Sequence, residues 1–322
     1  MRHFLRDDDL APAEQAAVLE RAAALKADRY STRPLAGPRT VAILFDKPTL
    51  RTQLSFTVGV TELGGYPLVV DGKLAMIGVR ESVADVARVL GPQVAAIVWR
   101  TFAQTSLVEM AAFAGVPVVN ALTDDFHPCQ ILADLLTVRE EFGDPAGRTL
   151  AYVGDGANNM AHSYLLGGAT AGMHVRIGTP AGYLPDERIV ADAAAIASAT
   201  GGSVQVLHDA VEAVAGADVV ATDTWVSMGQ ETEADERSEP FRPFQVSEDL
   251  MAKASPEAIA LHCLPAYRGR EITAGVVDGP ASRVWTEAEN RLHAQKALLC
   301  FLLEEPGSLL EEPGSLAEGP AA

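Results

Sequence analysis

The feature that most constrains the fold of this chain is the alternation of short β-rich runs with stretches of helical periodicity over most of its length. Strands separated by helices predict parallel sheets with right-handed crossovers, in which ligands bind at the carboxyl ends of the strands. The runs lie at residues 41–45, 66–70, 95–100 and 117–121 in the first half, and at 149–154, 174–179, 203–208, 218–223 and 258–264 in the second. The predicted fold class is therefore α/β, with two parallel-sheet domains joined by long helices.

Two long helices are predicted to join the domains. Residues 128–143 carry apolar side chains at helical spacing and close at a glycine-containing turn. Residues 286–303 form a last helix that would carry Arg291 back toward the first domain. We therefore expect a first domain at 1–137, completed by the helix 286–303, and a second domain at 138–285.

The end of the sequence holds an internal repeat, in which residues 302–308 recur as residues 309–315. Proline and glycine in each copy interrupt a helix, and two copies are too few for a solenoid. We predict that residues 304–322 form an acidic, disordered tail, with a partner-binding tail as the alternative.

Composition excludes several classes of function. The net charge of −18 disfavours general binding to nucleic acid or to anionic membranes, because phosphate contacts depend on lysine and arginine. Three cysteines without paired spacing indicate neither a disulfide framework nor a zinc cluster. The sequence has no apolar run long enough for a membrane span and no secretory signal at its N-terminus. These features predict a globular, cytoplasmic protein whose anionic ligands are held by a few local basic groups.

The segment His127-Pro128-Cys129-Gln130 lies where a strand gives way to a helix. A helix N-terminus offers unpaired N–H groups and the positive end of a dipole, which suits an anion or a carbonyl that must be polarised. On its own, the segment fits equally a histidine that only caps its own backbone. Further polar segments at other strand ends favour the functional interpretation.

Two arginines of the first half are candidate anion ligands. The segment Thr49-Leu50-Arg51-Thr52 follows a strand and opens a helix, so N–H groups, hydroxyls and a guanidinium converge there. Thr49 and Thr52 could also be plain helix caps. Arg100 ends an apolar strand, where its charge requires either a ligand or an ion-pair partner.

The second half has polar residues at three strand ends. The sequence Gly154-Asp155-Gly156-Ala157-Asn158-Asn159 lacks the third glycine of a dinucleotide fingerprint, and its asparagines suit a polar zwitterion better than a pyrophosphate. Asp223, four residues before Ser227, could hold an ammonium group. His262-Cys263 places a thiol at a neighbouring strand end, although most such cysteines are inert and buried. Residues 230–242 are a candidate mobile loop.

From about residue 2 to residue 303, the chain resembles anabolic ornithine carbamoyltransferases, most of all those of actinobacteria. The aspartate-specific relatives are disfavoured, because the Asp-x-x-x-Ser-Met-Gly motif marks ornithine as the acceptor. The resemblance is carried by Arg-Thr in the carbamoyl phosphate loop, Trp-Arg-Thr-Phe, His-Pro-Cys-Gln, Gly-Asp-Gly-x-Asn-Asn-Met, Asp-Thr-Trp-x-Ser-Met-Gly-Gln-Glu, His-Cys-Leu-Pro and Glu-Asn-Arg-Leu-His-Ala-Gln-Lys.

The resemblance implies transfer of the carbamoyl group of carbamoyl phosphate to the δ-amine of L-ornithine, giving citrulline and phosphate, as in arginine biosynthesis. It implies a carbamoyl phosphate-binding domain at 1–137, an ornithine-binding domain at 138–285, and no metal or organic cofactor. It also implies trimers or multiples of trimers, in which a loop from the adjacent subunit completes each site. The implied carbamoyl phosphate ligands are Thr49, Leu50, Arg51, Thr52, Met76, Arg100, His127, Gln130, Cys263, Leu264 and Arg291; the implied ornithine ligands are Asn159, Asp223, Ser227 and Met228.

In the implied reaction a neutral amine attacks the carbonyl carbon, and a tetrahedral oxyanion forms. Arg100, His127 and Thr52 would donate to that oxygen, and Arg51 would stabilise the leaving phosphate. Asp223 and Cys263 would orient the amine and help it to lose its proton. Closure of residues 227–242 would exclude water.

The sequence departs from the family pattern at three positions. Leu50 replaces a hydroxyl residue of the phosphate loop, Met76 replaces the glutamine that an adjacent subunit normally offers, and Tyr267 replaces a histidine. The loop is closer to that of toxin-insensitive members. The alternatives are therefore a specialised paralogue, insensitive to inhibitors or acting on another amine, and a binding protein that kept the fold and lost turnover.

Overall fold

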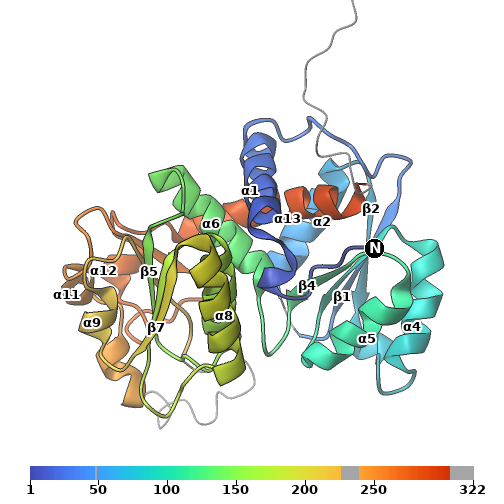
Figure 1. Cartoon of the computed structure of the whole chain (residues 1–322). Helices are drawn as coiled ribbons and strands as arrows, with labels where there is room; N and C mark the ends of the chain where they lie inside the picture. Colours follow the sequence, from blue (N-terminus) through green and yellow to red (C-terminus); the bar gives the residue numbers. More distant parts are fainter. Residues whose placement is uncertain (48, 226–238, 305–322) are drawn as a thin grey trace, which may run out of the picture.

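The computed structural model describes residues 1–47, 49–225 and 239–304. In this part of the chain, two parallel sheets form two halves that lie side by side (Figure 1). The first half contains η1 (Asp7–Asp9), α1 (Pro12–Ala27), β1 (Thr40–Phe45), α2 (Arg51–Glu62), β2 (Tyr66–Asp71), α3 (Gly72–Ala75), α4 (Val83–Leu90), η2 (Gly91–Gln93), β3 (Ala96–Arg100), α5 (Gln104–Ala114) and β4 (Val118–Leu122).

The second half follows the long helix α6 (Pro128–Phe142), which begins at the His-Pro segment. It contains β5 (Thr149–Val153), α7 (Asn159–Thr170), β6 (His174–Gly178), α8 (Glu187–Thr200), β7 (Ser203–Leu207), α9 (Ala210–Val214), β8 (Val219–Thr222), η4 (Glu239–Phe244), α11 (Glu248–Met251), β9 (Ile259–His262) and α12 (Ala274–Val277), and the last helix is α13 (Val284–Leu303).

The strand order explains which strands are buried. Among the described residues the sheets have the orders β2-β1-β3-β4 and β7-β6-β5-β8-β9, and every strand pair is parallel. The inner strands β1, β3, β5 and β8 are almost entirely buried because helices cover both faces, whereas the edge strands β2 and β7 are partly exposed. The predicted fold class is confirmed, and each predicted strand is present with ends shifted by at most two residues.

The C-terminal helix α13 belongs spatially to the first half. It packs against α6, α1 and α2, and Figure 1 shows it crossing from the second half to lie beside α1 and α2. Its fully buried Lys296 places Nζ 2.8 Å from Oε2 of Glu62, which also pairs with Arg29. This contact ties α13 to α2, as the predicted return of residues 286–303 requires.

Two helices differ from their predicted bounds. Helix α13 begins at Val284, two residues before the predicted start, because the N–H of Glu287 already donates to the carbonyl of Arg283. Residues 239–242 belong to the short helix η4, whose Phe241 and Phe244 are buried, so this end of the predicted loop is ordered by apolar burial. The remainder of the predicted loop and the tail at 305–322 lie outside the described residues.

The N-terminal residues extend the first sheet and then cross to the second half. Phe4 pairs in parallel with Val119 on the outer edge of β4, with its N–H 2.9 Å from the carbonyl oxygen of Val118. The next turn, η1, packs on α7 of the second half. The first residues of the chain therefore contact both halves.

Candidate active site

A cavity of about 970 Å³ lies between the two halves, at the carboxyl ends of strands from both sheets. This is the place where parallel α/β sheets bind ligands. Most of the residues predicted from sequence converge on it, namely Thr49, Leu50, Arg51, Thr52, Arg100, His127, Asn159, Asp223, Cys263, Leu264 and Arg291.

Three guanidinium groups face this cavity. Arg51 is the first residue of α2, Arg100 is the last residue of β3, and Arg291 comes from α13. Among the described residues none of the three forms an ion pair, and Nε of Arg100 and Nε of Arg291 have no hydrogen-bond partner. Concentrated positive charge without a protein counter-charge is the arrangement that an anionic ligand requires.

Burial and mutual repulsion act on the pKa values of these groups. Burial, followed by the charge of Arg291, lowers the pKa of Arg100 to about 10. Burial also lowers the pKa of Arg291. An anion bound among the guanidinium groups would offset this repulsion and raise both pKa values again.

Arg51 and Arg291 connect the parts of the site. Nη2 of Arg51 donates to the carbonyl oxygen of Leu264 at 2.7 Å, which links α2 to the loop after β9. Nη2 of Arg291 donates to Oγ1 of Thr52 at 2.7 Å, and Nη1 donates to Oε1 of Gln130 at 2.9 Å. The helix α2 begins at the cavity with Leu50 at its N-cap, which provides no side-chain cap, and the N–H of Thr52 donates to Oγ1 of Thr49 at 3.4 Å.

Gln130 lies behind Arg291 and not on the wall of the cavity. Its amide nitrogen donates to Asp134 and to Glu287, in each case at 2.8 Å, so all of its hydrogen-bonding groups serve the protein interior. Burial raises the pKa of Asp134 to about 6, and burial together with Asp134 raises the pKa of Glu287 further. The two carboxyl groups, which are hydrogen-bonded to each other, therefore bind a proton more tightly than free carboxyl groups do.

His127 is the N-cap residue of α6 and is almost completely buried. Its Nδ1 has no partner among the described residues. Burial, followed by the charges of Arg291 and Arg100, holds the pKa of His127 well below its usual range. The imidazole is therefore neutral at neutral pH, and one ring N–H can donate to an oxygen in the cavity.

The opposite wall is acidic. Asp223 follows β8 and Cys263 follows β9, and Sγ of Cys263 donates to Oδ1 of Asp223 at 3.1 Å. Burial raises the pKa of Asp223, and burial followed by the charge of Asp223 raises the pKa of Cys263 well above its usual value. The thiol is therefore protonated, and Asp223 is the group that can accept from a cationic ligand.

The loop after β9 is held in an uncommon conformation. Leu264 has φ +60°, in the left-handed region that favours glycine, and its N–H donates to Nδ1 of His262 at 2.9 Å. Nε2 of His262 lies 3.2 Å from Oε1 of Glu271. Asp223, His262 and Cys263 each have an atom of metal-ligating type within 4.8 Å of the others, but these atoms are already engaged in the contacts just described.

Helix α7 points its N-terminus at the cavity. Oδ1 of Asn158 caps the helix by accepting from the N–H of Ala161 at 2.9 Å, and Nδ2 of Asn159 donates to the carbonyl oxygen of Thr123 at 2.7 Å. The helix begins after Gly154, whose φ of +142° permits the turn that ends β5. The side chains of both asparagines thus form hydrogen bonds within the protein. The turn before α7, which lacks the third glycine of the fingerprint, does not resemble a dinucleotide-binding loop.

Besides Gln130, three predicted positions lie away from the cavity wall or outside the described chain. Met76, with φ +48°, is half-exposed beyond α3 and does not line the cavity. Ser227 and Met228 lie outside the described residues. Sequence reasoning missed the ion pair of Lys47 and Asp124, which lines the mouth of the cavity, although both residues flank motifs that were identified.

The fold and the cavity define a class: a two-domain α/β protein whose cavity has a basic wall suited to an anion on one half and an acidic wall suited to a cationic group on the other. Known proteins specify it further. Residues 2–140 match the family model "Aspartate/ornithine carbamoyltransferase, carbamoyl-P binding domain", and residues 146–302 match "Aspartate/ornithine carbamoyltransferase, Asp/Orn binding domain". The chain belongs to the aspartate/ornithine carbamoyltransferase family.

Individual relatives agree with this assignment. An ornithine carbamoyltransferase of Clavibacter sepedonicus is 64% identical over 304 residues, which cover 94% of this chain and 99% of the relative. An ornithine carbamoyltransferase of Mycobacterium ulcerans is 60% identical with the same coverage. The crystal-structure relative from Pyrococcus furiosus, also an ornithine carbamoyltransferase, is 44% identical, with a TM-score of 0.90 over 94% of this chain and 97% of that one.

Proposed function

We propose that this protein transfers the carbamoyl group of carbamoyl phosphate to the δ-amine of L-ornithine, forming L-citrulline and phosphate. The observation that carries the proposal is the cavity with three guanidinium groups on one wall, which form no ion pair among the described residues, and Asp223 with Cys263 on the other. A dianionic donor fits the first wall, and an amino acid with a second amine fits the second. The relatives above carry this activity in their names.

The reaction needs no redox step. The neutral δ-amine forms a C–N bond to the carbonyl carbon, the C–O bond to phosphate breaks, and the amine proton leaves with phosphate. In this proposal Arg100 and the neutral His127, which both line the cavity, would donate to the carbonyl oxygen as it becomes an oxyanion. Arg51 and the N-terminus of α2 would stabilise the phosphate.

The acceptor side orients the amine. Asp223 can hold an ammonium group, and the protonated Cys263 fixes the carboxylate by donating to it. This geometry supports a role for Cys263 in orienting the amine. Because the thiol is protonated, it does not act as the base that takes the proton of the amine. We include Asn159, Ser227 and Met228 in the ornithine site, and Gln130 in the donor site through its bond to Arg291.

The fold alone does not select the acceptor. An N-acetyl-L-ornithine transcarbamylase is 34% identical, with a TM-score of 0.85 over 94% of this chain. The test is therefore citrulline formation by the purified chain with carbamoyl phosphate and a panel of ornithine, N-acetylornithine, lysine and putrescine. We expect that ornithine is the one amine of this panel that is carbamoylated. Preferred carbamoylation of another amine, or no product with any amine, would refute the assignment.

We also propose that the chain forms trimers or multiples of trimers. Exposed apolar side chains on the edge strand β2, at and in α2, and after α3 support self-association, because monomeric proteins rarely expose large apolar patches. We refer to them as the apolar face; they are Leu50, which also lines the cavity, Leu54, Tyr66, Leu68, Val69, Met76 and Val79. Met76 on this face fits the role of a residue offered to an adjacent subunit.

The place of the enzyme in the cell is part of the proposal. No helix among the described residues is long and apolar enough to cross a membrane. Cys129, Cys263 and Cys300 are free thiols, which fit a reducing compartment. We place the activity in the cytoplasm and assign it to arginine biosynthesis.

A further inference from the structure

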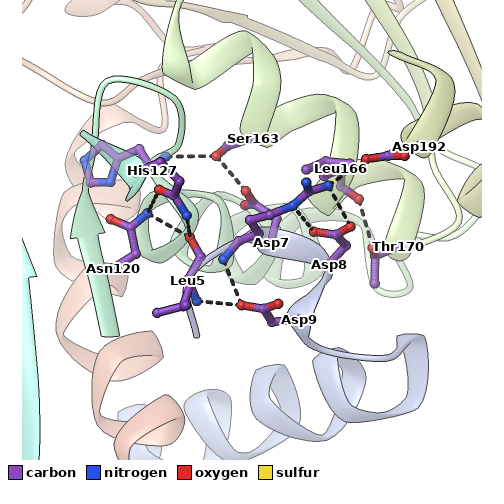
Figure 2. Close-up of polar contacts among 12 residues, drawn as sticks. Leu5, Asp7, Asp8, Asp9, Asn120, His127, Ser163, Leu166, Thr170 and Asp192 are labelled. Atoms are coloured by element: carbon purple, nitrogen blue, oxygen red, sulfur yellow. Dashed lines mark hydrogen bonds and ion pairs between the residues drawn. The ribbon is translucent and has the colours of Figure 1, made fainter. Parts of the chain in front are cut away.

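The N-terminal segment reaches the candidate site through a buried hydrogen-bond chain. Asp7, in η1, is 3% exposed, and Ser163, in the middle of α7, is fully buried. Oγ of Ser163 donates to Oδ2 of Asp7 at 2.6 Å and accepts from the backbone N–H of His127 at 2.9 Å. Figure 2 shows Ser163 between the backbone of His127 and the carboxylate of Asp7.

The direction of these bonds is fixed by chemistry. A backbone N–H can only donate, so the serine oxygen must accept from His127. The single hydroxyl proton is then available to Asp7, whose carboxylate oxygen accepts it. Without Asp7 the hydroxyl would lose its acceptor, and without Ser163 the buried N–H of His127 would have no partner in this arrangement.

The contact is supported by close packing of η1 on α7. A Cβ atom added at Gly167, one turn after Ser163, would lie 3.3 Å from Oδ1 of Asp7 and 2.5 Å from Cγ2 of Ile131. The carbonyl of Gly167 accepts from Nε2 of Gln15 at 3.0 Å. Glycine at this position therefore lets the N-terminal segment and α6 approach the same face of α7.

The same N-terminal segment also fixes the turn that precedes His127. Nδ2 of Asn120 donates to the carbonyl oxygen of Leu5 at 2.8 Å, and Nε2 of Gln104 donates to the same oxygen at 3.0 Å. Thr123, which donates to Gln104 at 2.8 Å, accepts from the N–H of Phe126 at 3.1 Å. Residues on both sides of the turn are thus connected to residues 5–7.

We propose that Asp7 and Ser163 are positioning residues for His127: they hold its backbone N–H and thereby set the direction of its imidazole in the site. Neither residue lines the cavity. The inference rests on the proposed function, because it assumes that His127 donates to the reacting carbonyl. It adds a contribution from Asp7, which is distant in sequence from every motif of the family resemblance.

The first test compares two hydroxyl deletions on the same helix. Ser163→Ala removes the hydrogen bond to His127, whereas Thr170→Val removes a buried hydroxyl that donates only to the carbonyl of Leu166 at 2.9 Å. Misplacing a catalytic group by about 1 Å can cost about 100-fold in rate. We expect Ser163→Ala to lower kcat by about 10- to 100-fold with little change in the KM for ornithine, and Thr170→Val to leave kcat within about twofold. Equal kcat values in the two variants would overturn the proposal.

The second test asks whether Asp7 acts through His127. Asp7→Ala removes the acceptor, whereas Asp7→Asn keeps an oxygen for the hydroxyl of Ser163 and should restore most of the turnover. The effect of Asp7→Ala on kcat should disappear when it is measured in a His127→Ala background, since residues that act as one unit are not additive. An equal fold-loss in both backgrounds would show a general structural role and refute the inference.

A readout independent of turnover covers variants that fold poorly. Amide hydrogen exchange of a peptide that contains His127 should accelerate in Ser163→Ala and in Asp7→Ala but not in Thr170→Val. Unchanged exchange in a folded Ser163→Ala protein would count against the proposal. A parent protein that makes no citrulline would instead refute the proposed function. The exchange experiment would still test whether Ser163 and Asp7 hold the backbone of His127.

Discussion

At the scale of single residues, the site depends on guanidinium groups that form no ion pair with another described residue. Arg100 is buried at the end of β3, and among the described residues its Nε has no partner. His127 stays neutral because burial, followed by the charges of the arginines around it, lowers its pKa. Both features are unfavourable for folding and favourable for binding an anion, so substitutions here should affect activity far more than stability.

The first prediction concerns His127 as a donor to the oxyanion. His127→Ala should lower kcat by about 100-fold or more, which is typical of losing one such donor. His174→Ala is the matched control, because His174 lies on β6 and contacts Ser203 far from the cavity. Steady-state kinetics would measure both variants. Near-normal turnover in His127→Ala would reject the assigned role.

The second prediction separates the two substrates. Asp223→Asn removes the negative charge at the end of β8 and should weaken ornithine binding by at least about 10-fold, while carbamoyl phosphate binding changes little. Asp218→Asn is the control at the other end of the same strand, where Asp218 pairs with Arg148. Calorimetry with each substrate provides the measurement. A comparable loss for both substrates would argue against an ornithine-reading carboxylate.

The third prediction concerns the departures from the family pattern. Leu50 has no hydroxyl and Met76 no amide, so two polar contacts to phosphate are missing. A hydrogen bond to a charged group contributes about 1.5–3 kcal/mol, which corresponds to about 10- to 150-fold in affinity. Leu50→Thr combined with Met76→Gln should therefore tighten both carbamoyl phosphate and phosphate-mimicking inhibitors. If neither binds more tightly, the specialised-paralogue alternative loses its main support.

The sequence predicted which residues lie at the strand ends, but not which residues they contact. Arg51, Arg100, Asp223 and Cys263 follow or end predicted strands, so their convergence follows from parallel topology alone. Gln130 shows the limit: three residues from His127 on one helix, it points into a buried network with Asp134 and Glu287. Two partners of Gln130, Glu287 and Arg291, come from α13, more than a hundred residues away, and no local pattern indicates them.

At the scale of elements, the helices α6 and α13 form the interface on which the site is built. Oε1 of Gln130, in α6, accepts from Nη1 of Arg291, in α13. Glu287 of α13 accepts from the N–H of His262 at 2.8 Å. A single buried network thus positions a guanidinium on the donor side and the β9 loop on the acceptor side. Strands and long helices could be predicted from periodicity, whereas this network depends on packing between elements distant in sequence.

The fourth prediction tests the proton held by this network. Because burial raises the pKa of Asp134 to about 6 and that of Glu287 further, the folded state binds protons that the unfolded state releases. Their stabilising contribution is complete below about pH 4 and is lost as the pH rises through the raised pKa values. Glu287→Gln should reduce this loss by up to about 1.4 kcal/mol per pH unit.

Urea unfolding between pH 4 and pH 9 would measure the effect. Glu289→Gln, an exposed substitution on the same helix, is the control and should follow the parent. A parallel pH dependence in Glu287→Gln and the parent would mean that the pair does not share a proton.

At the scale of the whole molecule, the two halves meet along the site and the apolar face on β2 points outward. The fifth prediction concerns this face. Leu68→Glu, on the exposed edge strand, should lower the molecular mass measured by sedimentation or light scattering to that of a monomer, because a buried charge is costly at an apolar interface. Val211→Glu, at an exposed apolar position on α9 in the other half, should leave the assembly unchanged. A parent that is itself monomeric would contradict the proposed assembly.

The position of Arg291 on the last helix has a consequence for how the protein is made. The first sheet is synthesised early, but α13 supplies both Arg291 and the buried Lys296 that pairs with Glu62. Domains generally fold in the order of synthesis, yet here the first half stays incomplete until the final helix has left the ribosome. A chain interrupted anywhere before residue 284 lacks Arg291 and with it one of the three guanidinium groups of the cavity, so a partly translated product should bind an anion more weakly than the full chain.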